Sequence, residues 1–86
     1  MTIFIPTPLR SYTAEKARVQ ANGATLAHLL QDMNSRYPGI RFRMIDEQGQ
    51  IRPHIKIFVN QEQVRDLSIA LTNSDDVLIV CALSGG

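Results

Sequence analysis

Val77-Leu78-Ile79-Val80-Cys81-Ala82-Leu83 is the stretch of this 86-residue chain that decides its fold. Seven consecutive apolar residues can bury both faces of a β-strand, and a strand buried on both faces lies inside a sheet rather than at its edge. Asp76 opens this strand, and Ser84-Gly85-Gly86 follows it. The stretch therefore predicts a central strand followed by a tail over residues 84–86, which we expect to be flexible.

The two glycines at the end need an explanation. Glycine makes up about 7% of ordinary sequence, so two terminal glycines arise by chance in roughly one chain in two hundred. With no Cβ on either residue, Gly85 and Gly86 could pass through a narrow enzyme channel and present a terminal carboxylate to a reagent. The alternative is that this end has no role in function.

Alternation of apolar and polar residues predicts the other strands. In the first, Ile3 and Ile5 alternate with Thr2 and Phe4. In the third, apolar residues at positions 55, 57 and 59 share one face. Strands are expected over residues 2–7, 16–20, 54–59 and 63–64, with a loop over residues 9–15 and connecting segments over residues 65–75.

A helix is indicated after Gly23. Thr25 is a favourable N-cap residue, and the apolar residues that follow recur at helical spacing. These residues are Leu26, Leu29, Leu30, Met33 and Tyr37. Pro38-Gly39 ends the helix. Residues 40–50 show no sustained period and predict an irregular crossover with a turn at residues 46–49.

These elements predict an α+β fold: a mixed sheet of four to five strands with one main helix packed across it, in one domain over residues 1–83. Their order suggests a β-grasp domain. The chain resembles the ubiquitin-like sulfur carriers, which include the thiamine sulfur carrier and the small subunit of molybdopterin synthase, and most of all the branch that supplies sulfur for cysteine synthesis. The residues that carry this resemblance are Ile5-Pro6-Thr7, Leu9-Arg10, Gly23-Ala24-Thr25-Leu26, Phe58-Val59-Asn60, Glu62, Val64-Arg65 and Gly85-Gly86.

The chain also departs from the family pattern. It has Ser74-Asp75-Asp76 where many members have Gly-Asp, and it lacks the proline that many have near Cys81. These differences concern the turn before the last strand and the exit of the tail. Neither affects the terminal glycine.

The resemblance implies a carrier rather than an enzyme. A separate adenylating enzyme, similar to ubiquitin-activating enzymes, would activate the carboxylate of Gly86, with Gly85 beside it, and sulfur would replace AMP to give a thiocarboxylate. A sulfur-accepting synthase is the second expected partner, and a metalloprotease that trims or releases the C-terminus is a third. ATP and magnesium would be used by the activating enzyme, and we expect the chain itself to bind no cofactor or metal.

The resemblance also implies a docking surface. Strand alternation places Phe58, Leu78 and Val80 on the face of the sheet opposite the helix, where they would form an apolar patch that partners bind. Ala82, Leu83 and Ser84 would contact the partner beside it. The alternative is that loops cover this face and the three residues belong to the core.

Charge and the remaining polar residues give few functional signals. Nine basic and eight acidic residues give a net charge of +1, so no strong field attracts nucleic acid or a membrane. The first residues do not resemble a signal peptide, and we expect a cytoplasmic protein. Cys81 is expected to be a small hydrophobic residue, and His28 with Asp32 a surface pair. The remaining basic cluster, interpreted as a solvated face, comprises Arg36, Arg41, Arg43 and Arg52.

Three alternatives remain open from the sequence. The chain could be a molybdopterin synthase small subunit, a ubiquitin-like modifier whose Gly86 joins target lysines, or a binding module with an incidental tail. The identity of its partners would separate the first from a soluble carrier. Conjugates to other proteins would indicate the second. If deletion of Gly85 and Gly86 has no effect on function, the third is indicated.

Overall fold

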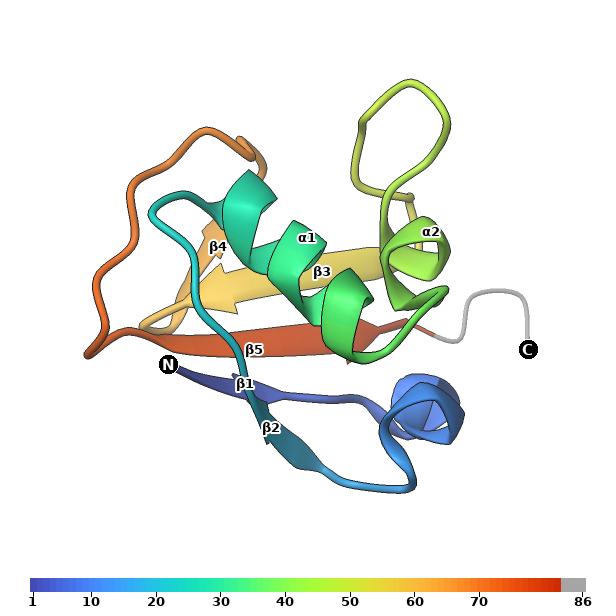
Figure 1. Ribbon diagram of the computed structural model, residues 1–86. Coiled ribbons are helices and arrows are strands. Elements are labelled where there is room, and N and C mark those ends of the chain that lie inside the picture. The colour runs from blue at the N-terminus through green and yellow to red at the C-terminus, as the bar shows by residue number, and fades with distance from the viewer. Residues whose placement is uncertain (83–86) are drawn as a thin grey trace.

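The computed structural model describes residues 1–82, which form a mixed sheet with helices on one side (Figure 1). The strands are β1 (Thr2–Phe4), β2 (Arg18–Gln20), β3 (Ile55–Val59), β4 (Glu62–Val64) and β5 (Asp76–Cys81). The helices are the 3₁₀ helix η1 (Thr7–Thr13), α1 (Leu26–Arg36) and α2 (Ile40–Met44). The predicted α+β class, with one main helix across a mixed sheet, is confirmed.

The sheet has the strand order β2-β1-β5-β3-β4, which places β5 at its centre. β5 pairs in parallel with β1 and antiparallel with β3, while β2 and β4 form the outer strands. The prediction from the apolar stretch is therefore confirmed, because the chain's last described strand lies between two others.

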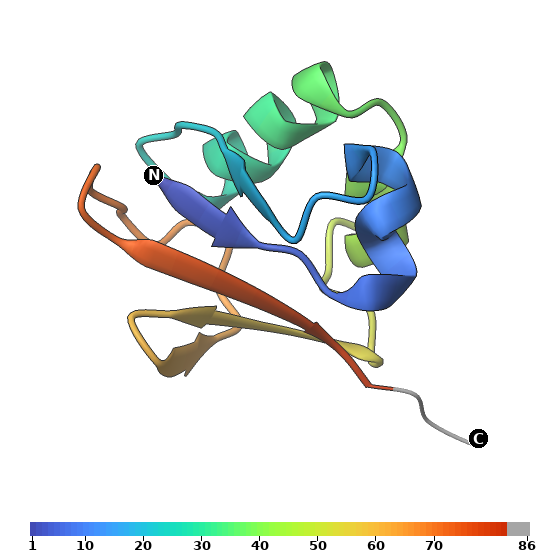
Figure 2. The ribbon, with the colours of Figure 1, turned by 90° about the horizontal axis from the view of Figure 1, so that it is seen from below.

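The core lies between the sheet and α1. On the inner face, Ile3 pairs with Val77 and Ile57 with Ile79, and all four side chains are buried. Four residues of the predicted helical stripe are also buried: Leu26, Leu29, Leu30 and Met33. Viewed along the sheet, α1 and α2 lie on the same side of β5 and β3 (Figure 2). One face of the sheet is thus packed, and the other is free of helices within residues 1–82.

α1 begins where the sequence predicts. Thr25 Oγ1 accepts a hydrogen bond from the His28 N–H at 3.2 Å, so one of the unpaired amides of the first turn is satisfied. The amides of Leu26 and Ala27 donate to the carbonyls of Ile69 and Leu67, at 3.1 and 2.8 Å. The segment between β4 and β5 therefore completes the helix cap.

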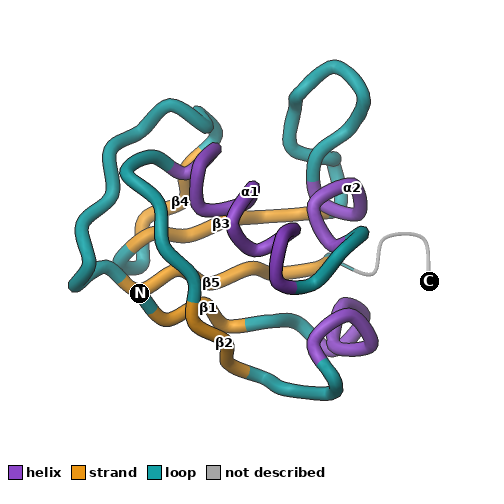
Figure 3. The backbone as a smooth tube through the Cα atoms, viewed as in Figure 1, coloured by secondary structure: helices purple, strands orange, loops and turns teal. Residues whose placement is uncertain are grey.

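Two predicted irregular segments are helical (Figure 3). The expected loop over residues 9–15 is wrong, because η1 spans Thr7–Thr13 and buries Leu9 and Thr13. The buried Thr13 hydroxyl hydrogen-bonds the carbonyls of Arg10 and Lys16, at 3.2 and 2.8 Å. A 3₁₀ helix has three residues per turn, so it gives no α-helical apolar period in the sequence.

The expected irregular crossover is also wrong at its start, since residues 40–44 form α2. Asn34 Oδ1 accepts hydrogen bonds from the amides of Gly39 and Arg41, at 3.0 and 3.2 Å, and so caps this helix from outside. Ile40 and Met44 are its buried residues. Five residues are too few for a period to be detected. The turn at residues 46–49 is present, with Asp46 Oδ1 accepting from the amides of Gln48 and Gln50.

The first two strands are shorter than predicted. β1 ends at Phe4 because Pro6 cannot donate a ladder hydrogen bond, although the Ile5 amide still donates to the Ala17 carbonyl at 2.8 Å. The boundary predicted between residues 83 and 84 lies outside the described residues. That boundary stays a prediction.

Candidate docking face and carboxyl-terminal exit

The face of the sheet opposite α1 presents an apolar patch. Along β5, Val77 and Ile79 are buried, whereas Leu78 keeps 44% of its surface exposed. Val80 and Phe58 are half-buried on the same face as Leu78. Within residues 1–82 no helix covers this face (Figure 2), so the alternative that these residues are core is not favoured.

The register of the strands places three large apolar side chains in one row. Phe4 on β1 pairs with Leu78, and Leu78 pairs with Phe58 on β3. These three residues line one shallow groove together with polar residues at its end, namely Asn60, Gln61 and Asp76. We call Phe4, Leu78 and Phe58 the apolar row. Phe4 was missing from the predicted docking surface, although its alternation with Ile3 and Ile5 already assigned it to the outer face.

The acidic turn before β5 fixes one end of this groove. Asp75 accepts hydrogen bonds from the Thr72 amide and from Asn60 Nδ2, each at 2.8 Å, and these bonds lower the pKa of its carboxyl group below the usual 3.8. Asn60 Oδ1 in turn accepts from the Asp76 amide at 3.0 Å. The β3–β4 turn and the start of β5 are therefore held together by one polar network.

The β3–β4 turn, Asn60-Gln61, contains residues with positive φ. Asn60 and Gln61 have φ of 51° and 74°, so both lie in the left-handed region. Two such residues in a two-residue hairpin turn match the right-handed twist of the flanking strands. Asn tolerates this conformation, whereas Gln is not favoured there.

At the far end of β5 the chain leaves the sheet. Cys81 pairs with Ile55, and the Ala82 amide donates to the His54 carbonyl at 2.7 Å. Ala82 is exposed and Cys81 is half-buried. The other predicted tail residues, Leu83, Ser84, Gly85 and Gly86, lie outside the described residues. Their proposed roles rest on the sequence.

The remaining polar residues make local contacts. Asp32 forms its ion pair with Arg36 at 3.0 Å rather than with His28, and it also accepts from the Asn22 amide, which lowers the pKa of its carboxyl group. Arg52 lies 4.6 Å from the centre of the Phe42 ring and donates to the Phe42 carbonyl at 2.8 Å. These contacts fit a solvated face, as interpreted from the sequence.

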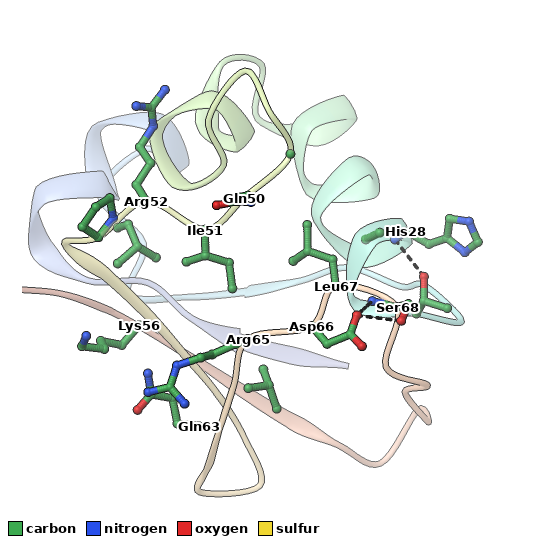
Figure 4. A pocket seen from close by; sticks show the side chains of 16 residues that line it. His28, Gln50, Ile51, Arg52, Lys56, Gln63, Arg65, Asp66, Leu67 and Ser68 are labelled. Atoms are coloured by element: carbon green, nitrogen blue, oxygen red, sulfur yellow. Dashed lines mark hydrogen bonds between the residues drawn. The ribbon is translucent and has the colours of Figure 1, made fainter.

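A second and larger hollow lies beside β4, between residues 49–53 and the segment that ends at Ser68, and the start of α1 also lines it (Figure 4). Its acidic residue, Asp66, accepts from the Ser68 amide at 2.8 Å and from the Ser68 hydroxyl at 2.6 Å, and these bonds lower the pKa of its carboxyl group. The carboxylate is thus engaged in a local turn.

Within residues 1–82, no helix is both long and apolar enough to span a membrane. No group of three or more His, Cys, Asp or Glu residues is placed to hold a metal ion within the same part of the chain.

The five-stranded sheet with one helix across it and a free apolar outer face defines a ubiquitin-like β-grasp domain. The chain belongs to the ThiS family, whose model matches residues 3–86. It is 36% identical over 91 residues to the sulfur carrier protein CysO of Mycobacterium tuberculosis, in an alignment that covers 100% of this chain and 98% of that protein. The resemblance inferred from the sequence is thereby confirmed.

Solved structures agree with this assignment. The crystal structure of Mycobacterium tuberculosis CysO aligns with a TM-score of 0.90 at 36% identity, over 95% of this chain and 98% of that one. The BexX/CysO complex of Amycolatopsis orientalis aligns with a TM-score of 0.91 at 35% identity, over 99% and 98% of the two chains. These alignments cover 95% and 99% of this chain.

Proposed function

We propose that this chain is a sulfur carrier for cysteine biosynthesis, in which the carboxylate of Gly86 is adenylated and converted to a thiocarboxylate. The observation that carries the proposal is the full-length similarity to CysO sulfur carrier proteins, in a match to the family that includes Gly85-Gly86. The matched relatives are named sulfur carrier proteins, which favours a carrier over a synthase subunit or a protein modifier. We place the protein in the cytoplasm, where ATP is available.

The chemistry explains why a partner is needed. A terminal carboxylate with an ordinary pKa of roughly 3.5 is ionised at neutral pH and is a poor electrophile. A separate adenylating enzyme, using ATP and magnesium, would join AMP to this carboxylate and release pyrophosphate. A sulfur nucleophile would then displace AMP. In this proposal the chain supplies the carboxylate and the docking surface, and the partner supplies the catalysis.

The domain must contribute binding energy of its own. Fixing the residues from Ala82 to Gly86 in a channel costs on the order of 1 to 2 kcal/mol each in backbone entropy. The apolar row, with Val80 beside it, is the exposed surface suited to offset that cost, since apolar burial contributes about 25 cal/mol per Å². We propose that the activating enzyme and the sulfur-accepting synthase bind this face, with Leu83 and Ser84 contacting the partner near the tail. A metalloprotease that acts on the C-terminus is a further proposed partner.

The first test is localisation of sulfur by mass spectrometry. The protein ending at Gly86 would be incubated with ATP, a sulfur source and extract of the source organism, then fragmented. Sulfur on Gly86 is the expected result. An unmodified Gly86 in an extract that modifies an added CysO protein would contradict the proposed function.

The docking role has its own test, the substitution Phe58→Ser. Phe58 occupies the end of the apolar row, so we expect a folded variant that is adenylated at least tenfold more slowly, the scale of losing about 1.4 kcal/mol at a binding hot spot. Phe42→Ser is the matched control, because Phe42 is a phenylalanine 53% exposed on α2, away from this face. Equal rates for the two variants would refute the docking role.

A further inference from the structure

Charged residues flank the apolar row on both sides along the direction of β5. Successive outward residues of a strand lie about 6.6 Å apart, so β5 presents Asp76, Leu78 and Val80 in a line. Lys56 is the cross-strand neighbour of Val80. Along β5 the outer face therefore carries a carboxylate at the start of the strand and an ammonium group on the side where the chain leaves the sheet, while exposed Arg18, the cross-strand neighbour of Phe4, lies to one side on β2.

Both charges are available to a partner. Within residues 1–82 the one ion pair joins Asp32 and Arg36, so neither Lys56 nor Asp76 forms an ion pair with another described residue. The Asp76 amide and carbonyl both bond to Asn60, and its exposed carboxylate takes no part in these bonds. Lys56 and Arg65 line the same hollow beside β4 (Figure 4), which adds a second cation on the Lys56 side.

An apolar row alone would not fix how a partner docks. Apolar contact is non-directional, so a partner turned by half a rotation could cover Phe4, Leu78 and Phe58 about equally well. That rotation would point the chain's exit away from the partner's channel. Charges of opposite sign at the two sides remove this ambiguity, because one of the two orientations brings like charges together.

We propose that Lys56 and Asp76 set the direction in which the adenylating enzyme docks. The partner would carry carboxylates beside the mouth of its channel, opposite Lys56, and a cationic side chain on the far side of its apolar socket, opposite Asp76. The inference rests on the proposed function, since a carrier whose Gly86 must enter a channel needs one orientation. The two charges lie about 13 Å apart along the strand, beyond the screening length of roughly 8 Å at physiological salt, so they act separately.

A competition experiment tests this proposal without a purified partner. Wild type and one variant at equal concentrations would share one extract of the source organism with ATP and sulfide as sulfur source. Mass spectrometry would separate them, and the ratio of their initial rates of sulfur incorporation at Gly86 equals the ratio of kcat/KM. We expect Lys56→Glu and Asp76→Lys each to lower this ratio about fivefold at low salt, with the loss shrinking at about 0.5 M salt.

Two variants control for net charge. Arg43→Glu changes charge in the same sense as Lys56→Glu, on an exposed residue of α2. Glu47→Lys matches Asp76→Lys, on an exposed turn. Both controls should stay within about twofold of wild type, since neither lies on the outer face. If the controls slow the reaction as much as the test variants, overall charge is responsible and the proposal is wrong.

The double variant Lys56→Glu/Asp76→Lys distinguishes two partners: the adenylating enzyme, whose charges stay fixed, and a second copy of this chain, which carries the same substitutions. Against a fixed partner both favourable contacts become repulsive, so the double variant should be slower than either single variant. Two copies related by a half-turn would regain complementary charges, so recovery of wild-type behaviour would overturn the proposal. Sulfur on Gly86 of wild type with no effect of any variant would overturn the orientation role alone, whereas no sulfur on wild type would overturn the proposed function as well.

Discussion

Gly23 packs closely against the backbone of α1, the helix that follows it in the chain. A Cβ on residue 23 would lie 2.7 Å from the carbonyl carbon of His28 and closer still to the Leu29 amide nitrogen, and both are backbone atoms that cannot move aside alone. We therefore expect Gly23→Ala to destabilise the fold by about 3 kcal/mol, at the upper end of overpacking effects. Urea unfolding would measure this.

Gly49→Ala is the matched control for Gly23. Gly49 has φ of 79°, but no atom lies within 4 Å of the position that a Cβ would take there, so a side chain meets open space. Its substitution should cost about 1 kcal/mol from backbone conformation alone. A Gly23→Ala variant no less stable than Gly49→Ala would contradict the steric argument.

Single residues also show what the sequence could and could not predict about the site. The outward direction of Phe58, Leu78 and Val80 followed from strand alternation and is confirmed by the fold. Phe4 joins them because β1 runs parallel to β5 with Phe4 opposite Leu78. A register between strands more than 70 residues apart is a tertiary property, and local patterns do not encode it.

At the scale of elements, the β3–β4 turn stores backbone strain at Gln61. Its φ of 74° is one that glycine adopts freely, and Asn-Gly is the preferred pair for this turn. Gln61→Gly should therefore stabilise the domain by about 0.5 to 1 kcal/mol, after the greater freedom of glycine in the unfolded chain is counted. Gln63→Gly, on β4, should instead destabilise it, and urea unfolding of both variants checks the sign.

The Asp75 network makes the stability of this end of the sheet depend on pH. Hydrogen bonds from Thr72 and Asn60 lower the folded-state pKa of Asp75 below 3.8. Its contribution is therefore present above the unfolded pKa of about 3.9 and is lost as the pH falls through the folded pKa. Asp75→Asn should be less stable than wild type at pH 7, and the difference should shrink toward about pH 2.

Urea midpoints of wild type and Asp75→Asn across this range test the linkage. Glu47→Gln, in the turn after α2, serves as the control because Glu47 is exposed and outside this network. A constant difference between wild type and Asp75→Asn at all pH values would show that the carboxylate's ionisation does not matter to the fold.

The elements differ in how far local sequence determined them. α1 was predictable because Thr25 caps it and its buried residues recur over about two turns. η1 and α2 were missed because each is too short to display a period, and each is held by a hydrogen bond with a residue outside it. Asn34 on α1 caps α2, and the Lys16 carbonyl accepts a hydrogen bond from the Thr13 hydroxyl of η1.

At the scale of the whole molecule, folding and sulfur chemistry belong to different parts of the chain. The buried apolar residues described by the structure extend from Ile3 to Ile79, whereas the proposed reactive carboxylate is on Gly86. Deletion of Gly85 and Gly86 should therefore leave the urea midpoint of the domain unchanged while it abolishes sulfur incorporation.

Deletion of Gly86 alone is the sharper version of this test, because it keeps a terminal carboxylate on a glycine but shortens the reach from the sheet by about 3.3 Å. If the docked domain sets the depth to which the tail enters the channel, the Gly85 carboxylate stops short of the adenylating centre and sulfur incorporation falls at least a hundredfold, as expected for a displacement of that size. Intact mass spectrometry after reaction with ATP and sulfide in the same extract measures the loss. Normal labelling of Gly85 would mean that the tail, rather than the outer face of the sheet, determines where the carboxylate is placed.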